Sequence, residues 1–153
     1  MKIRLAKLVD ISNISTLYRT LFQTMAELQI EYYRKADQDV DFLKSVINSD
    51  TGDILVAEED EQIIGFVLVQ QLDTPPYACI VPHRYTLLMD IVVSDLYRGQ
   101  GIGSALIEEA KLWSKRRGSE YIELSVVSQN RSAIEIYKGL QFVECIKIMR
   151  AKI

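Results

Sequence analysis

A glycine-rich turn between an apolar strand and an amphipathic helix is the feature that most limits how this chain can fold. Residues 85–93 are apolar almost throughout and are interrupted by Asp90, a pattern typical of a strand buried on both faces. The turn follows, and apolar side chains then recur at helical spacing from about Gly103 to Arg117, where Gly118 predicts the end of the helix. A strand of this kind favours a sheet with helices on its faces.

The rest of the chain alternates between strand-like and helix-like patterns, with no internal repeat, linker or change in composition. Further strands are predicted at residues 3–8, 54–57, 63–70, 121–127 and 142–148, and further helices at about 12–28, 38–48 and 131–140. Asp10 or Ser12 is expected to cap the first helix, and Asn130 the last. The order β-α-α-β-β-β-α-β-α-β predicts a mixed α/β (α+β) sheet in a single domain over residues 1–153.

Composition and charge exclude several classes of protein. With 153 residues, 48% of them hydrophobic, the chain is long enough to bury one substantial core. Its 18 Lys and Arg residues against 21 Asp and Glu give a net charge of −3, which disfavours a general nucleic-acid binder. No apolar run reaches the length of about 20 residues that crosses a bilayer, and the first residues lack the apolar centre of a signal peptide. We therefore expect a soluble, cytoplasmic protein that binds neither nucleic acid nor membrane.

Cysteine and histidine are too scarce for metal or disulfide chemistry. Cys79 and Cys145 are each isolated in an apolar stretch, which predicts two free, buried thiols. His83 is the single histidine, and no partners at metal-ligand spacing surround it. The sequence therefore implies no metal site.

The glycine-rich turn, Arg98 to Ser104, has the character of a phosphate-binding loop. Glycines let the backbone turn its N–H groups inward, and the start of the next helix attracts phosphate oxygens. A dinucleotide-binding loop would need a third glycine where this chain has Ser104 or Leu106. A P-loop would need Lys followed by Ser or Thr, and that pair is missing from the turn. The spacing that does fit is R-x-x-G-x-G, met by Arg98, Gly101 and Gly103.

This loop resembles the coenzyme A pyrophosphate loop of the GNAT (Gcn5-related N-acetyltransferase) superfamily. The likeness extends over nearly the whole chain: the order of elements matches, as do the strand ending at Val93, Gly65, and the helix from Asn130 to Tyr137. One departure is that glycine sits at Gly139, whereas family members usually carry it directly before the residue equivalent to Phe142. The resemblance implies a mostly antiparallel sheet of six to seven strands flanked by about four helices, in which the fourth and fifth strands splay apart.

The resemblance also implies an activity, the direct transfer of the acetyl group of acetyl-CoA to a primary amine of a small molecule or protein within a ternary complex. The main chain of Ile91 and Val93 would hold the pantetheine arm, joined by the side chain of Asn130, and a main-chain N–H near Ile91 or Val92 would stabilise the oxyanion. Coenzyme A would be bound at its pyrophosphate by Arg98, Gly99, Gln100, Gly101, Ile102, Gly103 and Ser104. Homodimerisation is a habit of the family that this sequence leaves open.

Two side chains are candidates for proton transfer, and each has an alternative structural role. Tyr137 resembles the family's general acid, and with an ordinary pKa of about 10 its hydroxyl can donate at neutral pH; it could equally be a core aromatic. Asp90 resembles the position of a catalytic glutamate, and the alternative is a structural carboxylate hydrogen-bonded to a neighbouring loop. Asn130 could act as a helix cap only.

Two other functions compete with acetyl transfer. One is a non-catalytic domain that binds acyl-CoA as a sensor, and the other is an interaction module. On the acceptor side, the family uses the loop between the first two helices and the segment after the third strand, here residues 27–33 and 74–77. The first region is acidic through Glu27, Glu31, Asp37, Asp39 and Asp41. It could attract a cationic amine, or its carboxylates could simply be solvated.

Overall fold

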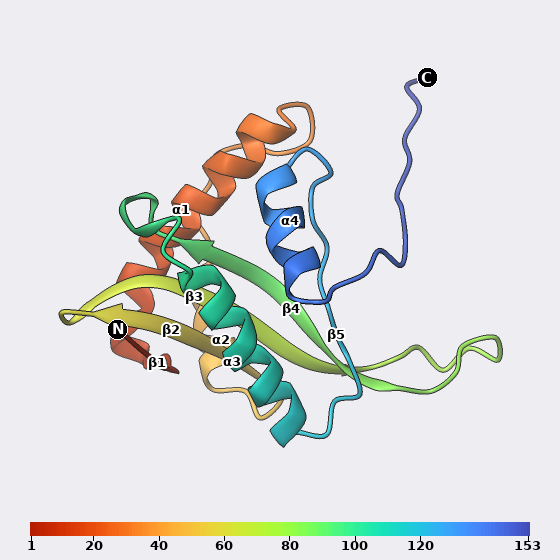
Figure 1. Cartoon of the computed structure of the whole chain (residues 1–153), viewed down its shortest axis with the longest axis horizontal. Coiled ribbons are helices and arrows are strands. Elements are labelled where there is room, and N and C mark those ends of the chain that lie inside the picture. Colours follow the sequence, from red (N-terminus) through yellow and green to blue (C-terminus); the bar gives the residue numbers. More distant parts are fainter.

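The computed structural model describes all 153 residues as three layers, with helices on both faces of one sheet (Figure 1). The elements, in chain order, are β1 (Lys2–Leu5), the short helix η1 (Leu8–Asp10), α1 (Ile11–Leu28), α2 (Val40–Ile47), β2 (Gly52–Glu59), β3 (Gln62–Asp73), β4 (Arg84–Val93), η2 (Asp95–Tyr97), α3 (Ile102–Arg116), β5 (Ile122–Glu123) and α4 (Arg131–Gly139). The predicted mixed α/β fold and its four helices are confirmed, with ends within about three residues of the expected ones.

The sheet has five strands in the order β1-β2-β3-β4-β5, rather than the expected six to seven. The first four pair antiparallel, and β5 pairs parallel with β4 at only two positions, Thr86 with Ile122 and Leu87 with Glu123. The predicted strand at 121–127 is therefore reduced to two residues, and the predicted strand at 142–148 is wrong. Both segments have strand-like sequences, but residues 124–127 and 142–148 have no neighbouring strand within this chain.

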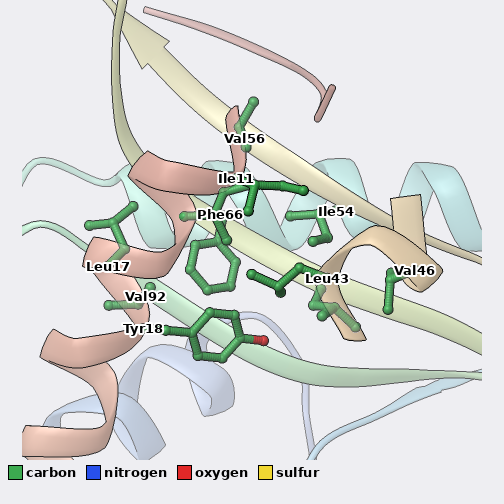
Figure 2. Close-up of a cluster of buried hydrophobic side chains, with 11 residues drawn as sticks. Ile11, Leu17, Tyr18, Leu43, Val46, Ile54, Val56, Phe66 and Val92 are labelled. Carbon is green, nitrogen blue, oxygen red and sulfur yellow. The ribbon is translucent and has the colours of Figure 1, made fainter. Parts of the chain in front are cut away.

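Side chains of β2 and β3 alternate between two separate cores. One core lies between the sheet and helices α1 and α2, where Phe66 packs against Tyr18 with ring centroids 4.8 Å apart (Figure 2). The other lies under α3, which contributes Leu106, Ile107 and Trp113. Every central strand is thus buried on both faces, which explains why its sequence is almost continuously apolar.

A β-bulge at Met89 changes which face the end of β4 presents. Val69 pairs with Leu88 and Leu68 pairs with Asp90, so that Met89 is an extra residue on β4. Since strand side chains alternate, one extra residue exchanges the two faces from that point on. Leu88 lies in the core under α3, whereas Val92 lies in the core under α1. Asp90, two residues before Val92, is consequently turned toward α1.

Two of the helix ends have the residues predicted from the sequence in their expected roles, and a third does not. Asn130 caps α4 by accepting a hydrogen bond from the N–H of Ala133, and Gly118 follows α3 with φ +75°. Asp10, however, does not cap α1 with its side chain. Its carboxylate accepts hydrogen bonds from the N–H of Lys7 and from the guanidinium of Arg4. Neighbouring donors therefore hold Asp10 against β1 and lower the pKa of its carboxyl.

The two cysteines also differ from expectation. Cys79 and Cys145 are free, as predicted, but both are exposed rather than buried. Cys79 lies in the connection between β3 and β4, and Cys145 follows α4, where no strand forms. None of the helices has the length and apolar character that a membrane span requires.

Gly65 is needed where β3 approaches β4 closely. A Cβ at this position would lie 2.9 Å from the carbonyl oxygen of Val92, a main-chain atom that cannot move without disturbing β4. We expect Gly65→Ala to lower the free energy of unfolding by about 1–3 kcal/mol, the usual cost of overpacking. Gly139→Ala is the matched control, because nothing lies within 4 Å of its added Cβ, and its stability should not fall. Urea unfolding measures both; equal losses would contradict the steric argument.

Candidate functional site

The glycine-rich turn opens the N-terminus of α3 to solvent. Gly99 and Gly101 have φ values of +76° and +81°, which glycine adopts without strain, and no atom lies within 4 Å of a Cβ built on either. Gly101 is the N-cap of α3, and no side chain caps the helix. The first N–H groups of this 15-residue helix are therefore free to bind an anion, and the helix dipole favours negative charge there.

Arg98 ties this turn to the end of β4. Its Nε donates to the carbonyl oxygen of Val93 at 3.3 Å, and its Nη2 lies 2.9 Å from the carboxylate of Asp95. The guanidinium is half exposed, so the ion pair is weak and can rearrange around a ligand. A cation thus stands beside the open helix end.

Beyond Leu87, β4 has a partner on one side only. Ser94 donates its N–H to the carbonyl of Ile64 at the start of β3. Main-chain groups of alternate residues point to opposite sides of a strand, so those of Ile91 and Val93 point away from β3. Because β5 pairs with β4 only through Leu87, no strand pairs with these groups, and the carbonyl of Val93 accepts only the hydrogen bond from Arg98. The structure thus confirms that the fourth and fifth strands splay apart.

Asp90 forms a hydrogen-bonded pair with Tyr18, across the core between β4 and α1. The Tyr18 hydroxyl donates to the Asp90 carboxylate with an O–O distance of 2.7 Å, and Tyr18 is fully buried. Burial raises the pKa of the Asp90 carboxyl, although the hydrogen bond from Tyr18 opposes the shift. The same burial, together with the nearby carboxylate, raises the pKa of Tyr18 far above its usual value. Tyr18 therefore remains a donor, and Asp90 is the group of the pair that can take up a proton.

Tyr137 lies on the opposite face of the sheet from Asp90. It packs against the core under α3, with its ring centroid 5.9 Å from that of Phe142. Burial raises the pKa of its hydroxyl, so the group is protonated throughout the physiological range. Phe142 follows Gln141, whose φ of +69° is the left-handed conformation usually taken by glycine. The departure from the family pattern therefore leaves a residue other than glycine in the turn that follows Tyr137.

A cavity of about 350 Å³ lies where the end of α1, the start of α4 and the last residues of the chain come together. It is lined by Leu28, Gln29, Ile30, Glu31, Tyr32, Ser128, Gln129, Ile148 and Arg150. The amide of Gln29 donates to Gln129 at 2.9 Å and so joins the loop after α1 to the residues before α4. Of the two segments expected on the acceptor side, only residues 27–33 contribute to this cavity. Residues 74–77 follow β3 and precede β4, at the end of β4 opposite to the glycine turn.

Two of the acidic residues after α1 form exposed ion pairs. Glu31 pairs with Lys152 at 3.0 Å and Asp37 pairs with Arg19 at 2.5 Å. Asp39 caps α2 by accepting a hydrogen bond from the N–H of Asp41. These pairs reduce the local field, so the acidic mouth predicted from the sequence is weaker than the charge count implies.

Comparisons with known proteins assign this chain to a family. The family described as "Acetyltransferase (GNAT) family" matches residues 20–142, which include the splayed strands, the glycine turn and Tyr137. This chain is a GNAT acetyltransferase-family protein. The family assignment agrees with the resemblance expected from Arg98, Gly101 and Gly103.

Two curated relatives illustrate the similarity. An uncharacterized N-acetyltransferase of Methanocaldococcus jannaschii is 31% identical over 135 residues, covering 88% of this chain and 57% of its own length. The uncharacterized N-acetyltransferase YhfO of Bacillus subtilis is 29% identical over 141 residues, covering 90% of this chain and 87% of its own. The chain therefore spans just over half of the archaeal relative and most of the bacterial one.

Solved structures share the fold at low sequence identity. A tetramutant of the BH1408 protein from Bacillus halodurans matches over 100% of both chains, with a TM-score of 0.94 and 20% identity. The aminoglycoside N-acetyltransferase AAC(6')-Iy, solved in complex with CoA, covers 99% of this chain and 98% of its own, with a TM-score of 0.75 and 16% identity. These matches place the architecture in the GNAT fold.

The structure brings most of the candidate site residues predicted from the sequence to the end of β4. They do not all lie on the same face of the sheet. The turn from Arg98 to Ser104 directly follows β4, whose unpaired residues are Ile91 and Val93, while Asp90 and Tyr137 lie on opposite faces. Sequence reasoning missed Tyr18, the partner of Asp90. A signal was present, because Tyr18 follows Ile14 by four residues and so lies on the buried stripe of α1, where its hydroxyl needs a partner. The hydrogen-bond partner of Asp90 is therefore the side chain of Tyr18 on α1, rather than a neighbouring loop.

The raised pKa of Asp90 makes a prediction about stability. The folded protein holds a proton on Asp90 more tightly than the unfolded chain, so the ionised carboxylate opposes folding above the raised pKa. Asp90→Asn keeps an oxygen for Tyr18 and removes the buried charge, and it should raise the melting temperature at pH 7 by about 2–4 °C for each kcal/mol regained. This gain in melting temperature should shrink as the pH falls through the raised pKa of Asp90, because the wild-type side chain is then as uncharged as the asparagine.

The matched variant is Asp90→Ala, which also removes the charge but leaves the buried hydroxyl of Tyr18 without an acceptor, so its melting temperature should lie below that of Asp90→Asn at every pH. Thermal unfolding between pH 5 and 8 compares the three proteins. A melting temperature of Asp90→Asn below wild type at pH 7 would contradict the argument, because the carboxylate would then stabilise the fold.

Proposed function

We propose that this GNAT-family chain transfers the acetyl group of acetyl-CoA to a primary amine of a small molecule or protein, by direct attack within a ternary complex. The observation that carries the proposal is the unpaired edge of β4 directly before the glycine turn. An extended ligand can pair with such an edge as an added strand, while its anionic end reaches an open helix N-terminus. Acetyl-CoA has both parts, a pantetheine arm with two amides and a pyrophosphate.

The turn suits the pyrophosphate because its glycines leave room for it. A Cβ on Gly99 or Gly101 would project into open space, where nothing else lies within 4 Å. The N–H groups at the start of α3 would bind the phosphate oxygens, together with the backbone of Gln100, Gly101, Ile102 and Gly103. Ser104 adds a hydroxyl in the first turn, and Arg98 supplies a positive charge beside it.

The edge of β4 suits the pantetheine arm and the reacting carbonyl. Ile91 and Val93 would exchange main-chain hydrogen bonds with the two amides of the arm. Asn130 caps α4 and would also contact the arm with its side chain. The N–H of Ile91 also points to the open side, whereas that of Val92 points toward β3. Ile91 is therefore the better of the two predicted donors to an oxyanion, and one such donor is worth about 3 kcal/mol of barrier.

Two groups would manage the protons. The bound thioester supplies an activated carbonyl, which the amine nitrogen attacks as the C–N bond forms and the C–S bond breaks. Asp90 would accept the proton that the amine loses, since burial raises the pKa of its carboxyl and Tyr18 holds it in place. Tyr137, on the other face, would donate a proton to the departing sulfur. Acid and base thus act from opposite sides of the sheet.

Binding of coenzyme A tests the first half of the proposal. We expect calorimetry to detect saturable binding of acetyl-CoA and CoA, and Gly101→Asp to raise the dissociation constant at least about tenfold, or 1.4 kcal/mol, because a carboxylate then meets the pyrophosphate. Gly118→Asp is the matched control, with the same added charge and a φ of +75°, at the other end of α3. It should bind as wild type does. No binding at millimolar coenzyme A, or equal losses in both variants, would contradict the assignment.

Replacement of Tyr137 tests the second half. Tyr137→Phe keeps the packing against Phe142 and removes the hydroxyl, so kcat should fall roughly 10²–10⁴-fold while the affinity for acetyl-CoA is unchanged. Tyr121→Phe, on the segment that stacks against Tyr85, should leave both quantities unchanged. Thiol release with a panel of polyamines, aminoglycosides and lysine peptides provides the assay. Saturable binding with no turnover on any amine would favour the acyl-CoA sensor instead.

A further inference from the structure

Helix α4, which carries Tyr137, is attached to the rest of the molecule by few contacts. No residue of α4 is fully buried, and at nine residues the helix is too short to be stable alone. Tyr137, together with Leu140 and Phe142 just after the helix, packs against the core under α3. Beyond the hydrogen bonds of its first turn, residues 131–142 form a single hydrogen bond with the remainder of the chain. The place of the Tyr137 hydroxyl therefore depends on how the end of α4 is held.

The end of α4 is closed by two main-chain hydrogen bonds. Phe142 donates its N–H to the carbonyl of Tyr137, and Gln141 donates to that of Lys138, each at 3.0 Å. This pair of bonds is the Schellman motif, and the packing of the Phe142 ring on Tyr137 is the apolar contact that accompanies it. The motif needs a left-handed residue at Gln141, whose φ is +69°. That conformation is unfavourable for a residue with a side chain, so the turn beside Tyr137 carries strain.

Lys111 of α3 supplies the one hydrogen bond that reaches this turn from outside. Its Nζ donates to the carbonyl of Leu140 at 2.8 Å and lies 5.6 Å from the ring centroid of Phe142. It also lies 2.8 Å from the carboxylate of Glu108, one turn earlier in α3, which keeps the ammonium in place. A charged donor forms a stronger hydrogen bond than a neutral one, and the negative end of the α4 dipole favours a cation there. One side chain thus contacts the residues on both sides of Gln141.

We propose that Lys111 is a positioning residue for Tyr137. The ammonium holds Leu140 and Phe142 in place and offsets the strain at Gln141. It thereby fixes the last turn of α4, from which Tyr137 projects. A tyrosine hydroxyl lies far from its own main chain, so a small rotation of the helix would displace it from the departing sulfur, and a displacement of about 1 Å can lower a rate about 10²-fold. The inference rests on the proposed function of Tyr137 as the acid, and Lys111 acts only through it.

Hydrogen exchange tests the contact without coenzyme A or an acceptor. Lys111→Met keeps the alkyl chain and removes the ammonium, so the amides of Gln141 and Phe142 should exchange at least about tenfold faster than in wild type. Lys115→Met is the matched control, because Lys115 lies one turn further along α3 and its exposed side chain has no hydrogen bond or ion pair. The same two amides should exchange in this control as in wild type. Unchanged exchange in Lys111→Met would overturn the proposal, because other contacts would then hold the end of α4.

Steady-state kinetics tests the link to Tyr137. In the thiol-release assay, kcat of Lys111→Met should be at least about tenfold below wild type while the KM for acetyl-CoA is unchanged, because the hydroxyl acts on the departing sulfur. Lys111→Met added to Tyr137→Phe should lower kcat no further, since a residue that acts through a missing hydroxyl has nothing to position. Lys111→Arg keeps the cation and should retain most of the wild-type kcat. Circular dichroism at the assay temperature verifies that each variant is folded.

A second substitution separates positioning from stability. Gln141→Gly removes the strain that the ammonium offsets, so Lys111→Met combined with Gln141→Gly should recover kcat to within about threefold of wild type. A loss of stability alone would leave kcat unchanged in enzyme that is fully folded at the assay temperature.

The outcomes distinguish this inference from the proposed function. A wild-type kcat in Lys111→Met, or a loss that adds in full to that of Tyr137→Phe, would overturn the positioning role while the acid role of Tyr137 stands. Full turnover in Tyr137→Phe would contradict the proposed acid itself, and the positioning role of Lys111 would fall with it.

Discussion

The departure of β5 from β4 after two paired residues is the constraint on which the rest of this molecule depends. A central strand normally satisfies its main-chain groups on both sides, and β4 does so only through Leu87. From there to Val93 one edge is free, and the chain then turns through glycines into an unprotected helix end. An unpaired edge and an open helix N-terminus are each unfavourable in isolation. Placed in succession, they form the series of donors and acceptors to which we propose that acetyl-CoA binds.

The bulge at Met89 determines which face of the sheet Asp90 occupies. Without the extra residue, Asp90 would point toward α3 and away from Tyr18. With it, Asp90 reaches the hydroxyl of Tyr18 and remains available from the α1 face, while Tyr137 stays on the α3 and α4 face. One inserted residue thus places Asp90 and Tyr137 on opposite faces of the sheet. The mechanism proposed above uses this separation, with Asp90 as the base for the amine and Tyr137 as the acid for the sulfur.

Most of the fold could be predicted because its signals are local. Hydrophobic periodicity located the four helices and the antiparallel strands, and the glycines located the turn before α3. The features that sequence missed depend on distant contacts. Met89 resembles any other apolar strand residue, and only its pairing with β3 makes it a bulge. Asp10 has the composition of a helix cap, but Arg4 competes for its carboxylate from β1. The burial expected for Cys79 and Cys145 assumed that an apolar neighbourhood in sequence becomes a core in space.

The two incomplete strands have one cause. Residues 121–127 and 142–148 have the side chains of strands, and a strand exists only where a neighbour provides hydrogen bonds. Ile122 and Glu123 find that neighbour in β4, whereas residues 124–127 and 142–148 find none within this chain. A prediction that rests on side-chain preference alone therefore fails where the main chain has no partner. Lys147, Arg150 and Lys152 interrupt the apolar residues after α4, which limits pairing of this segment with other strand edges.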